Sequence, residues 1–546
     1  MRVSKSIRHP AAVLTAALLT ACAGAPVAPR QPAVTAHASP AMPVVNVPAI
    51  KRPDGETPAW WFTAGAAEAA TRGATHAHAK NLILFVGDGM SLTTVAAARI
   101  LAGQRAGQSG EEYRLTWEDF GHTALSRTYN VDLQTPDSAG TMSAMATGLK
   151  TRGGVISVDQ TMPRGQCTGL AEGARLSLWE LAAEAGLETG VVTTARLTHA
   201  TPAATLAHVP DRNWEADSDT PEAARASGCT DIAQQMIGNP YGKGATVLMG
   251  GGRVNFMPES QPDPEYPAQR GRRKDGRDLI AQWRHAHPEG RYVWNNAQLA
   301  EAPPHTPLLG LFEPSHMQWE NARNAGPEGE PSLAQMTRAA IERLQHNDSG
   351  FVLLVEGGRI DHGNHNGNAF LALNETIALS DAVRTAREMT SESDTLILVT
   401  ADHSHSLVFV GYPDRGNPIL GLVANRDAQG TLKPTKAEDG LPYTTLAYAN
   451  GPGHRDGATR PDLTKVDTSD PDFLQEALVP TNAETHGGDD VGVWASGPGA
   501  DAVRGNIEQN TIFHLLLQAQ PQLRQAVCER YGCTADGVPV NLPRPH

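Results

Sequence analysis

Short runs of apolar residues alternate along the chain with longer segments in which apolar positions recur with a helical period. The runs have the continuous apolar character of strands that are buried on both faces: Asn81–Val86, Thr189–Thr193, Ala245–Met249, Gly350–Val355, Thr395–Thr400 and Val491–Ala495. Helices are predicted at Ser91–Leu101, Leu176–Ala185, Leu333–Leu344 (with Ser332 as N-cap), Phe370–Glu388 and Ile507–Ala519. This alternation predicts an α/β fold, a three-layer αβα arrangement in which helices cover a large, mainly parallel central sheet.

The alternation weakens between Tyr412 and Pro480. Gly, Pro, Asp and Asn are frequent there, and such residues favour turns and loops. We interpret residues 412–480 as a small subdomain that is inserted into one large domain of residues 59–546.

The first 21 residues have the pattern of a secretory signal peptide. Basic residues precede the mostly apolar stretch Ala11–Thr20, which is too short to span a bilayer as a stable anchor. The stretch runs into Leu19-Thr20-Ala21-Cys22, which resembles the bacterial lipobox, a signal for cleavage before the cysteine and lipidation of its thiol. The alternative is ordinary cleavage near Ala21 or Ala23, which leaves a free thiol.

Residues 22–58 are rich in Pro and Ala and carry few charges, so they predict a tether. Lipidation of Cys22 would make the protein an exported lipoprotein, periplasmic or on the cell surface, that is attached to a membrane through its lipid anchor. Ala23, directly after the cysteine, resembles an outer-membrane sorting signal.

The chain is acidic, with 45 Lys and Arg against 59 Asp and Glu and a formal net charge of −14. No basic run of useful length appears, so the composition argues against nucleic acid as a partner. Solubility is a sufficient explanation of the acidity.

Export permits disulfides, and four cysteines remain besides Cys22. Cys528 and Cys533 flank Glu-Arg-Tyr-Gly and are expected to pair as a small terminal loop, which leaves Cys167 to pair with Cys229. Metal binding by these cysteines is disfavoured because clustered CxxC spacing is absent.

Several apolar runs end at, or lie just before, residues that can bind metals. Because open α/β sheets bind ligands beyond the carboxyl ends of their strands, residues far apart in sequence are expected to converge at one edge. The set is Asp88, His199, Thr201, Glu356, Asp361, His362, His365, Asp402, His403 and His486. Any one of these is more often structural, but together they predict a metal site for hard and borderline cations.

Pro136–Lys150 contains a candidate nucleophile, Ser138, where small residues begin a predicted helix that Gly148 can end. A helix N-terminus suits a phosphate group. The alternative is that Ser138 only caps the helix. Arg212 can clamp two phosphate oxygens, although its segment taken alone favours a surface ion pair with Asp211 or Glu215.

At this point the chain resembles the alkaline phosphatase family, most closely its animal-type branch, from about Asn81 to near Cys533. The motifs that carry the resemblance occur in order: Gly87-Asp88-Gly89-Met90, Pro136-Asp137-Ser138-Ala139, His199-Ala200-Thr201-Pro202-Ala203, Val355–His365, Thr400–His405 and Glu484-Thr485-His486-Gly487-Gly488. The bacterial type with Asp and Lys near its metals differs, because this chain has His199 and His362. The cysteine placement also resembles the animal type.

The resemblance implies two zinc ions and one magnesium ion. One zinc would take Asp361, His365 and His486, and the second Asp88, Asp402, His403 and the Ser138 oxygen. Magnesium would take Asp88, Thr201 and Glu356, with His199 acting through bound water and His362 lying near the first zinc and the phosphate. The expected function is a phosphate-monoester hydrolase of broad specificity and alkaline optimum, working by in-line displacement through a phosphoserine at Ser138 with help from Arg212.

The resemblance further implies a calcium site and a homodimer. Calcium ligands in animal-type relatives resemble Glu265, the Phe312 carbonyl and Glu313; the fourth counterpart is Glu330, with Glu328 as its rival because the spacing differs. The 412–480 insertion resembles the animal-type crown, which contacts a second subunit.

Two rival interpretations remain. A related phosphodiesterase or sulfatase is disfavoured, since many such diesterases use Thr and sulfatases use a modified Cys or Ser in another motif. A surface binding protein with an inactive site is disfavoured by the intact set of candidate ligands.

Overall fold

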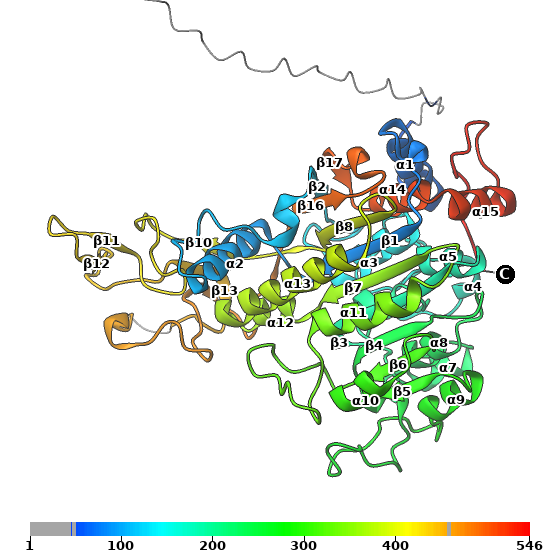
Figure 1. The fold of residues 1–546 in the computed structure, drawn as a ribbon, viewed down its shortest axis with the longest axis horizontal. Helices are drawn as coiled ribbons and strands as arrows, with labels where there is room; N and C mark the ends of the chain where they lie inside the picture. Colours follow the sequence, from blue (N-terminus) through cyan, green and yellow to red (C-terminus); the bar gives the residue numbers. More distant parts are fainter. Residues whose placement is uncertain (1–44, 46–50, 456–459, 546) are drawn as a thin grey trace, which may run out of the picture. The chain divides into compact units, whose positions relative to one another are not determined.

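The computed structural model describes residues 45, 51–455 and 460–545. A ten-stranded sheet lies at the centre of this part of the chain (Figure 1), and its strand order is β17-β2-β16-β8-β1-β7-β3-β4-β6-β5. Helices cover both faces, so the predicted three-layer α/β fold is confirmed. The predicted signal peptide and Cys22 lie outside the described residues.

Most of the sheet is parallel. The strands from β8 to β5 all run in one direction: β8 (Thr395–Ala401), β1 (Asn81–Gly87), β7 (Phe351–Gly357), β3 (Glu188–Arg196), β4 (Val247–Gly251), β6 (Leu308–Leu311) and β5 (Arg291–Val293). β16 (Val491–Ser496) is antiparallel to both of its neighbours, β8 and β2 (His122–Arg127). β17 (Gly505–Glu508) adds a parallel edge strand beside β2.

Strand β1 shows why the continuous apolar runs form buried strands. Successive side chains point to opposite faces, and Leu82, Leu84 and Val86 pack into one hydrophobic core while Ile83 and Phe85 pack into the other. All of β1 is buried. A strand with both faces covered must be apolar at every position, as the sequence pattern indicates.

Two groups of helices form the outer layers. One core contains residues of α2 (Leu92–Arg105), α11 (Leu333–Leu344), α12 (Arg359–His365) and α13 (Ala369–Met389). The opposite core contains residues of α1 (Pro58–Thr71), α3 (Ser138–Thr147), α5 (Leu178–Glu184), α14 (Thr511–Ala519) and α15 (Pro521–Tyr531). Helix α11 has its predicted bounds and its predicted Ser332 cap.

The prediction of a helix from Ile507 to Ala519 is wrong at its beginning. Ile507 lies in strand β17, where it pairs with Ser126 of β2, and the helix begins only at Thr511. One buried isoleucine before an apolar helix fits a helical period as well as a strand. Ile507 forms a strand because it pairs with β2, which lies far earlier in the chain. A local sequence pattern carries no information about that pairing.

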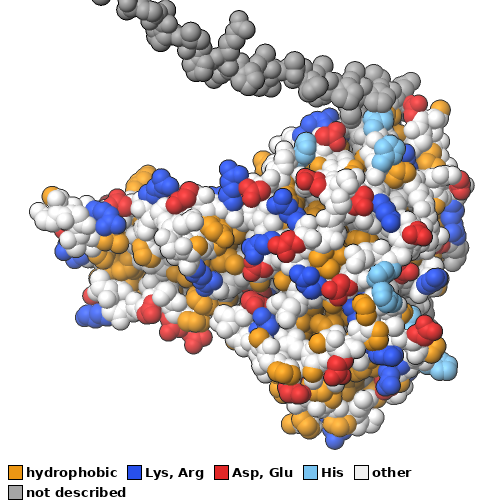
Figure 2. Space-filling view, viewed as in Figure 1, with side chains coloured by type: hydrophobic (Ala, Val, Ile, Leu, Met, Phe, Trp, Pro, Cys, Tyr) orange, Lys and Arg blue, Asp and Glu red, His pale blue; other side chains and the backbone are white. Residues whose placement is uncertain are grey.

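Beyond His405 the chain forms two small sheets apart from the central one (Figure 1). One contains β10 (Leu407–Phe409), β13 (Leu446–Gly451) and β14 (Ala477–Pro480), and the other pairs β11 (Ala424–Arg426) with β12 (Leu432–Pro434). On the face displayed in Figure 2, acidic and basic side chains are interspersed. No helix among the described residues has the length and apolar content needed to cross a membrane.

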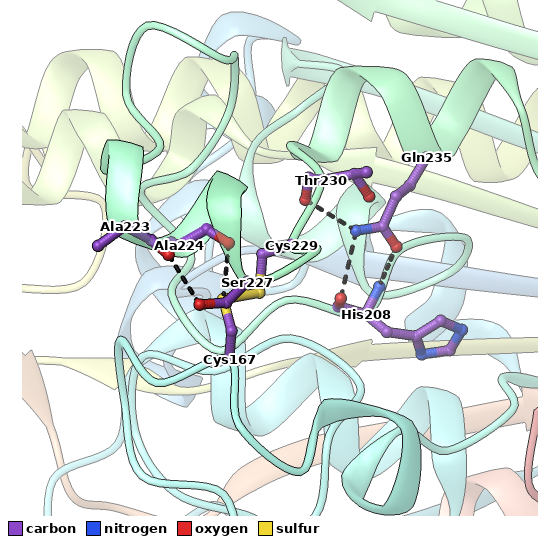
Figure 3. The surroundings of a disulfide bond; sticks show 8 residues. All are labelled: Cys167, His208, Ala223, Ala224, Ser227, Cys229, Thr230 and Gln235. Atoms are coloured by element: carbon purple, nitrogen blue, oxygen red, sulfur yellow. Dashed lines mark hydrogen bonds between the residues drawn. A yellow bond between two sulfur atoms is a disulfide. The ribbon is translucent and has the colours of Figure 1, made fainter.

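The structure contains both expected disulfides. Cys167–Cys229 joins residues 62 apart in sequence and lies beside Ala224 (Figure 3), whereas Cys528–Cys533 joins residues 5 apart. The first bond therefore ties the segment before α5 to the segment that follows α7 (Glu222–Ala226).

The two disulfides are expected to stabilise the fold unequally. The entropy of loop closure grows as the logarithm of loop length, so the 62-residue separation should contribute about 2 kcal/mol more than the 5-residue one. Cys167→Ser/Cys229→Ser should lower the calorimetric Tm by about 2 °C more than Cys528→Ser/Cys533→Ser, given the unfolding entropy of so long a chain. Equal shifts, or the reverse order, would contradict this account.

Candidate active site

The carboxyl ends of three neighbouring strands bring together acidic residues that are far apart in sequence. β1 lies between β8 and β7. Asp88 follows β1 directly, Asp402 follows β8 directly, and Glu356 is the penultimate residue of β7. All three side chains are fully buried.

Helix α3 carries Ser138 to this edge. Asp137, not Ser138, is the N-cap, and its carboxylate accepts a hydrogen bond from Gly140 N at 3.1 Å. The Ser138 hydroxyl is thereby left for other contacts: its Oγ lies 3.1 Å from His403 Nε2 and 3.4 Å from Asp88 Oδ1. Ser138 therefore faces candidate metal ligands, and the interpretation of it as a simple cap is wrong.

Asp88, Asp402 and His403 form the first candidate metal group around Ser138. Their ligand atoms lie within 4.8 Å of one another. Gly89 N and His403 N both donate to Asp402 Oδ1, at 3.0 and 2.9 Å. Gly89 has a φ of +67°, and a Cβ there would lie 2.4 Å from the His405 ring, so the turn after β1 requires glycine.

Asp361, His365 and His486 form a second group. Asp361 and His365 are one turn apart on α12, so they share a side of the helix. His486 arrives in β15 (His486–Gly487), which pairs with β9 (Ser404–His405). His365 Nε2 and His486 Nε2 lie 3.3 and 3.4 Å from Asp361 Oδ1. The His486 ring stacks on His403 at 3.6 Å between centroids, which joins the two groups.

His405 and Glu484 belong to the same site, although the sequence analysis assigned neither a role. His405 lies within ligand distance of the second group, its Nε2 is 2.8 Å from Asp361 Oδ1, and its Nδ1 bonds the Glu484 carboxylate. The Glu484 carbonyl accepts from His365 Nδ1 at 2.5 Å. Glu484 thus orients two imidazoles. Two features of the sequence could have indicated these roles. His405 ends the Asp402-His403-Ser404-His405 motif, and Glu484 lies two residues before His486.

A third group surrounds Glu356. Ligand atoms of Asp88, Glu356 and His199 lie within 4.8 Å of one another. Thr201, in α6 (Ala200–Ala203), adds a buried hydroxyl beside Glu356. Asp88 Oδ2, Glu356 Oε1 and His199 Nδ1 are buried without a hydrogen-bond partner among the described residues. Unpaired buried oxygens and nitrogens of this kind fit divalent cations.

The pKa shifts of the buried carboxylates also favour bound cations at this site. Burial raises the pKa of Asp88 well above its ordinary value, and Asp402 and Asp361 add to the shift. Burial also raises the pKa of Glu356 to about 8. Burial would raise the pKa of Asp361 too, but the neighbouring imidazoles, His365 first, hold it well below its usual range. Carboxylates this close together are stable as anions only beside positive charge.

Arg212 supplies a guanidinium at the same site. Its Nη1 lies 3.1 Å from Asp137 Oδ2, and its Nη2 lies 3.2 Å from His199 Nε2. The alternative ion pairs for Arg212 do not form, because Asp211 binds Arg164 and Glu215 binds Arg196. Asp137 therefore caps the helix of Ser138 and holds Arg212 beside it.

The candidate calcium ligands lie in one region apart from these groups, but among the described residues the oxygens of Glu265, Glu313 and Glu330 do not all lie within 4.8 Å of one another. Gln318 donates its backbone N–H to Glu330 and its side-chain amide to Glu313, at 2.7 and 3.0 Å. Burial and the nearby Glu313 raise the pKa of Glu330 to about 8. Glu265 lies near both but pairs with Arg253 at 3.1 Å, and Phe312 is buried beside Glu313. Glu328 is exposed, so the geometry favours Glu330 over its rival.

Comparison with known proteins identifies the family. A family model described as "Alkaline phosphatase" matches residues 79–521. The chain is 44% identical over 450 residues to the alkaline phosphatase of Gadus morhua, covering 81% of this chain and 91% of the cod protein. It is 43% identical over 450 residues to the tissue-nonspecific isozyme of Homo sapiens, covering 81% and 83%. The crystal structure of Thermus thermophilus alkaline phosphatase superimposes with a TM-score of 0.58 at 25% identity, covering 81% and 92%.

The chain therefore belongs to the alkaline phosphatase family, and its relatives support the animal-type branch. It is a phosphate-monoester hydrolase with a metal-dependent mechanism, and the clusters described above are its candidate metal-binding groups.

Glu484 is expected to control how firmly metal is held. Residues that orient metal-binding imidazoles typically change metal affinity by about 10- to 100-fold when they are removed. Glu484→Ala should therefore release metal to a chromogenic chelator about tenfold faster than the unmodified protein. The control is Glu438→Ala, which removes an exposed carboxylate from the 412–480 region. Release at the same rate in all three proteins would exclude this role for Glu484.

Proposed function

We propose that Ser138 is the nucleophile of a phosphate-monoester hydrolase of broad specificity and alkaline optimum. The observation that carries the proposal is the position of the Ser138 hydroxyl, within 3.4 Å of both Asp88 and His403 at the start of a buried helix. The N-terminal N–H groups of α3 and the Arg212 guanidinium can together receive the phosphoryl oxygens. Attack by Ser138 would give a phosphoserine, which water then hydrolyses.

The metal scheme has two zinc ions and one magnesium ion. One zinc would be held by Asp361, His365 and His486, and the other by Asp88, Asp402, His403 and Ser138. Magnesium would be held by Asp88, Thr201 and Glu356, with His199 beside it. Imidazole-containing sets suit zinc, and an all-oxygen set suits magnesium. When bound, such ions supply Lewis-acid activation and charge stabilisation for phosphoryl transfer.

The residues of the chain itself have clear tasks in this scheme. Asp137 fixes Arg212 through its 3.1 Å contact, so that the guanidinium is ready for phosphate without a large loss of conformational freedom. Burial of Ser138 keeps bulk water away from the attacking oxygen. An alkaline optimum follows because the hydroxyl must lose its proton before attack. His362, whose ring centroid is 5.6 Å from that of His199, would lie near the first zinc and the phosphate.

Ser138→Ala should reduce turnover of 4-nitrophenyl phosphate by at least about 1000-fold, since no other nucleophile replaces the hydroxyl. Elemental analysis should find two zinc ions and one magnesium ion per chain in the unmodified protein. Ser143→Ala, on the same helix, is the matched control and should stay active. Turnover within tenfold of the unmodified protein in the Ser138 variant would remove Ser138 as nucleophile.

The protein is further proposed to be an exported lipoprotein, anchored through Cys22 and a tether of residues 22–58 to a membrane, with outer-membrane sorting. The lipobox-like sequence supports this. Cys22→Ser should move the protein from the membrane fraction to the soluble fraction after cell lysis, while phosphatase activity per molecule stays unchanged. Unchanged fractionation would contradict lipidation.

We also propose a homodimer through the crown-like 412–480 insertion. On the three-stranded sheet the outer strands expose apolar side chains: Phe409 on β10 is 45% exposed, and Leu478 on β14 is 78% exposed. Tyr412 follows β10 and is 93% exposed. Exposed apolar side chains favour association. A monomer mass in sedimentation equilibrium at micromolar concentration would contradict the dimer.

Calcium is proposed as a fourth ion, at Glu265, the Phe312 carbonyl, Glu313 and Glu330. Its support is the free Glu330 Oε2, which is buried without a hydrogen-bond partner among the described residues. Oxygen ligands of this type suit calcium. The absence of a calcium-dependent rise in Tm would count against it.

A further inference from the structure

Arg359 lies next to the active site without a carboxylate partner. It is the first residue of α12, the helix that carries Asp361, His362 and His365. Among the described residues, no carboxylate oxygen lies within ion-pair distance of its guanidinium. This distinguishes it from two neighbouring arginines, since Arg212 pairs with Asp137 and Arg196 with Glu215.

The contacts of Arg359 hold its side chain in one place without giving it an ion-pair partner among the described residues. The guanidinium carbon lies 3.6 Å from the centroid of the Trp319 ring, a stacking contact. Its Nη1 lies 3.3 Å from His362 Nδ1. The carboxylates of Glu375 and Glu330 attract Arg359 only from beyond ion-pair distance; Glu375 accepts from Glu320 N, and Glu330 accepts from Gln318 N, both at 2.7 Å.

Arg359 also determines which hydrogen bonds His362 can make. Because Arg359 donates to Nδ1, the neutral ring carries its proton on Nε2 and presents a donor there. The ring is in contact with His316, at 4.2 Å between centroids, and His316 is 5.4 Å from His199. Arg359, His362, His316 and Trp319 are all partly exposed, so the group borders solvent at the edge of the catalytic site.

A fixed cation with a neighbouring N–H donor is an arrangement that accepts an anion. Arg359 Nε is buried without a hydrogen-bond partner among the described residues. Partial burial of a guanidinium without a carboxylate partner is unfavourable, and an arriving carboxylate or phosphate would reduce that cost and bind through charge-assisted hydrogen bonds. The scissile phosphate already has Arg212 and the start of α3. The charge of Arg359 is therefore available to a second anionic group on the same substrate.

We propose that Arg359, supported by Trp319 and joined by His362, forms an accessory anion subsite. It would select phosphate monoesters whose leaving group carries a second negative charge close to the ester oxygen, such as phosphorylated hydroxy acids. This inference rests on the proposed function, because the subsite acts on substrates that are hydrolysed at Ser138.

Two substrates that differ only in the distal group provide the test. 2-Phosphoglycolate ends in a carboxylate, and 2-hydroxyethyl phosphate ends in a neutral CH₂OH group. Arg359→Met keeps the length and apolar packing of the side chain and removes its charge. It should lower kcat/KM for 2-phosphoglycolate about tenfold or more, chiefly through KM, because one charge-assisted interaction is lost. The value for 2-hydroxyethyl phosphate should change by less than about threefold, which is within the range expected of a site that does not contact the distal group.

Two further variants separate a loss of anion recognition at Arg359 from a general effect of removing a positive charge. Arg384→Met removes a positive charge from the surface of α13, where Arg384 pairs with Asp381, and should leave the ratio of the two kcat/KM values unchanged. Arg359→Lys keeps the charge, so it should retain more of the preference for 2-phosphoglycolate than Arg359→Met, and it remains informative if the Met variant does not fold.

Each outcome is decisive. An unchanged ratio in Arg359→Met, or an equal loss on both substrates in both Arg359 variants, would overturn the subsite while leaving the proposed function intact. If the unmodified, metal-loaded protein hydrolysed neither of the two substrates, the proposed function would be overturned, and the subsite with it.

Discussion

The structure depends on the burial of four carboxylates, Asp88, Glu356, Asp361 and Asp402, at one edge of a sheet. Mutual repulsion and desolvation both oppose their ionisation. Hydrogen bonds from Gly89 and His403 and contacts with His365 and His405 offset part of this, but one oxygen of Asp88 and one of Glu356 stay without hydrogen-bond partners among the described residues. Divalent cations are the groups that resolve such a concentration of buried negative charge, and the protein around the site is arranged to hold them.

The parallel sheet makes this arrangement possible. Strands β8, β1 and β7 are adjacent and run in one direction, so a single edge receives residues that are hundreds of positions apart. Because each strand is clamped between two apolar cores, the positions at which the strands end are rigid. Helices α3 and α12 then add Ser138 and the Asp361–His365 turn from opposite layers. The proposed nucleophile and the imidazoles of α12 thus come from different faces of the sheet.

Much of this could be predicted from the sequence, for physical reasons. Apolar runs reveal strands that are buried on both faces, and the residues after them mark the binding edge; Asp88 and Asp402 follow this rule directly. The bounds of α11 were predictable because Ser332 caps it locally. Interactions that depend on distant partners were not. Ile507 joins a strand because of β2, and the roles of Asp137 and Glu484 depend on Arg212 and His405. Arg359 is part of a recognisable sequence motif, but only the structure shows that no carboxylate among the described residues forms an ion pair with it.

The pairing of β15 with β9 has a consequence for how the protein matures. His486 reaches His403 and His405 only after the intervening insertion has been made, because the two short strands lie on either side of it. A chain that is still being synthesised therefore has an incomplete imidazole set until about nine-tenths of it, up to His486, has been made. Capture of a cation by the full set of imidazoles must therefore follow the synthesis of most of the polypeptide.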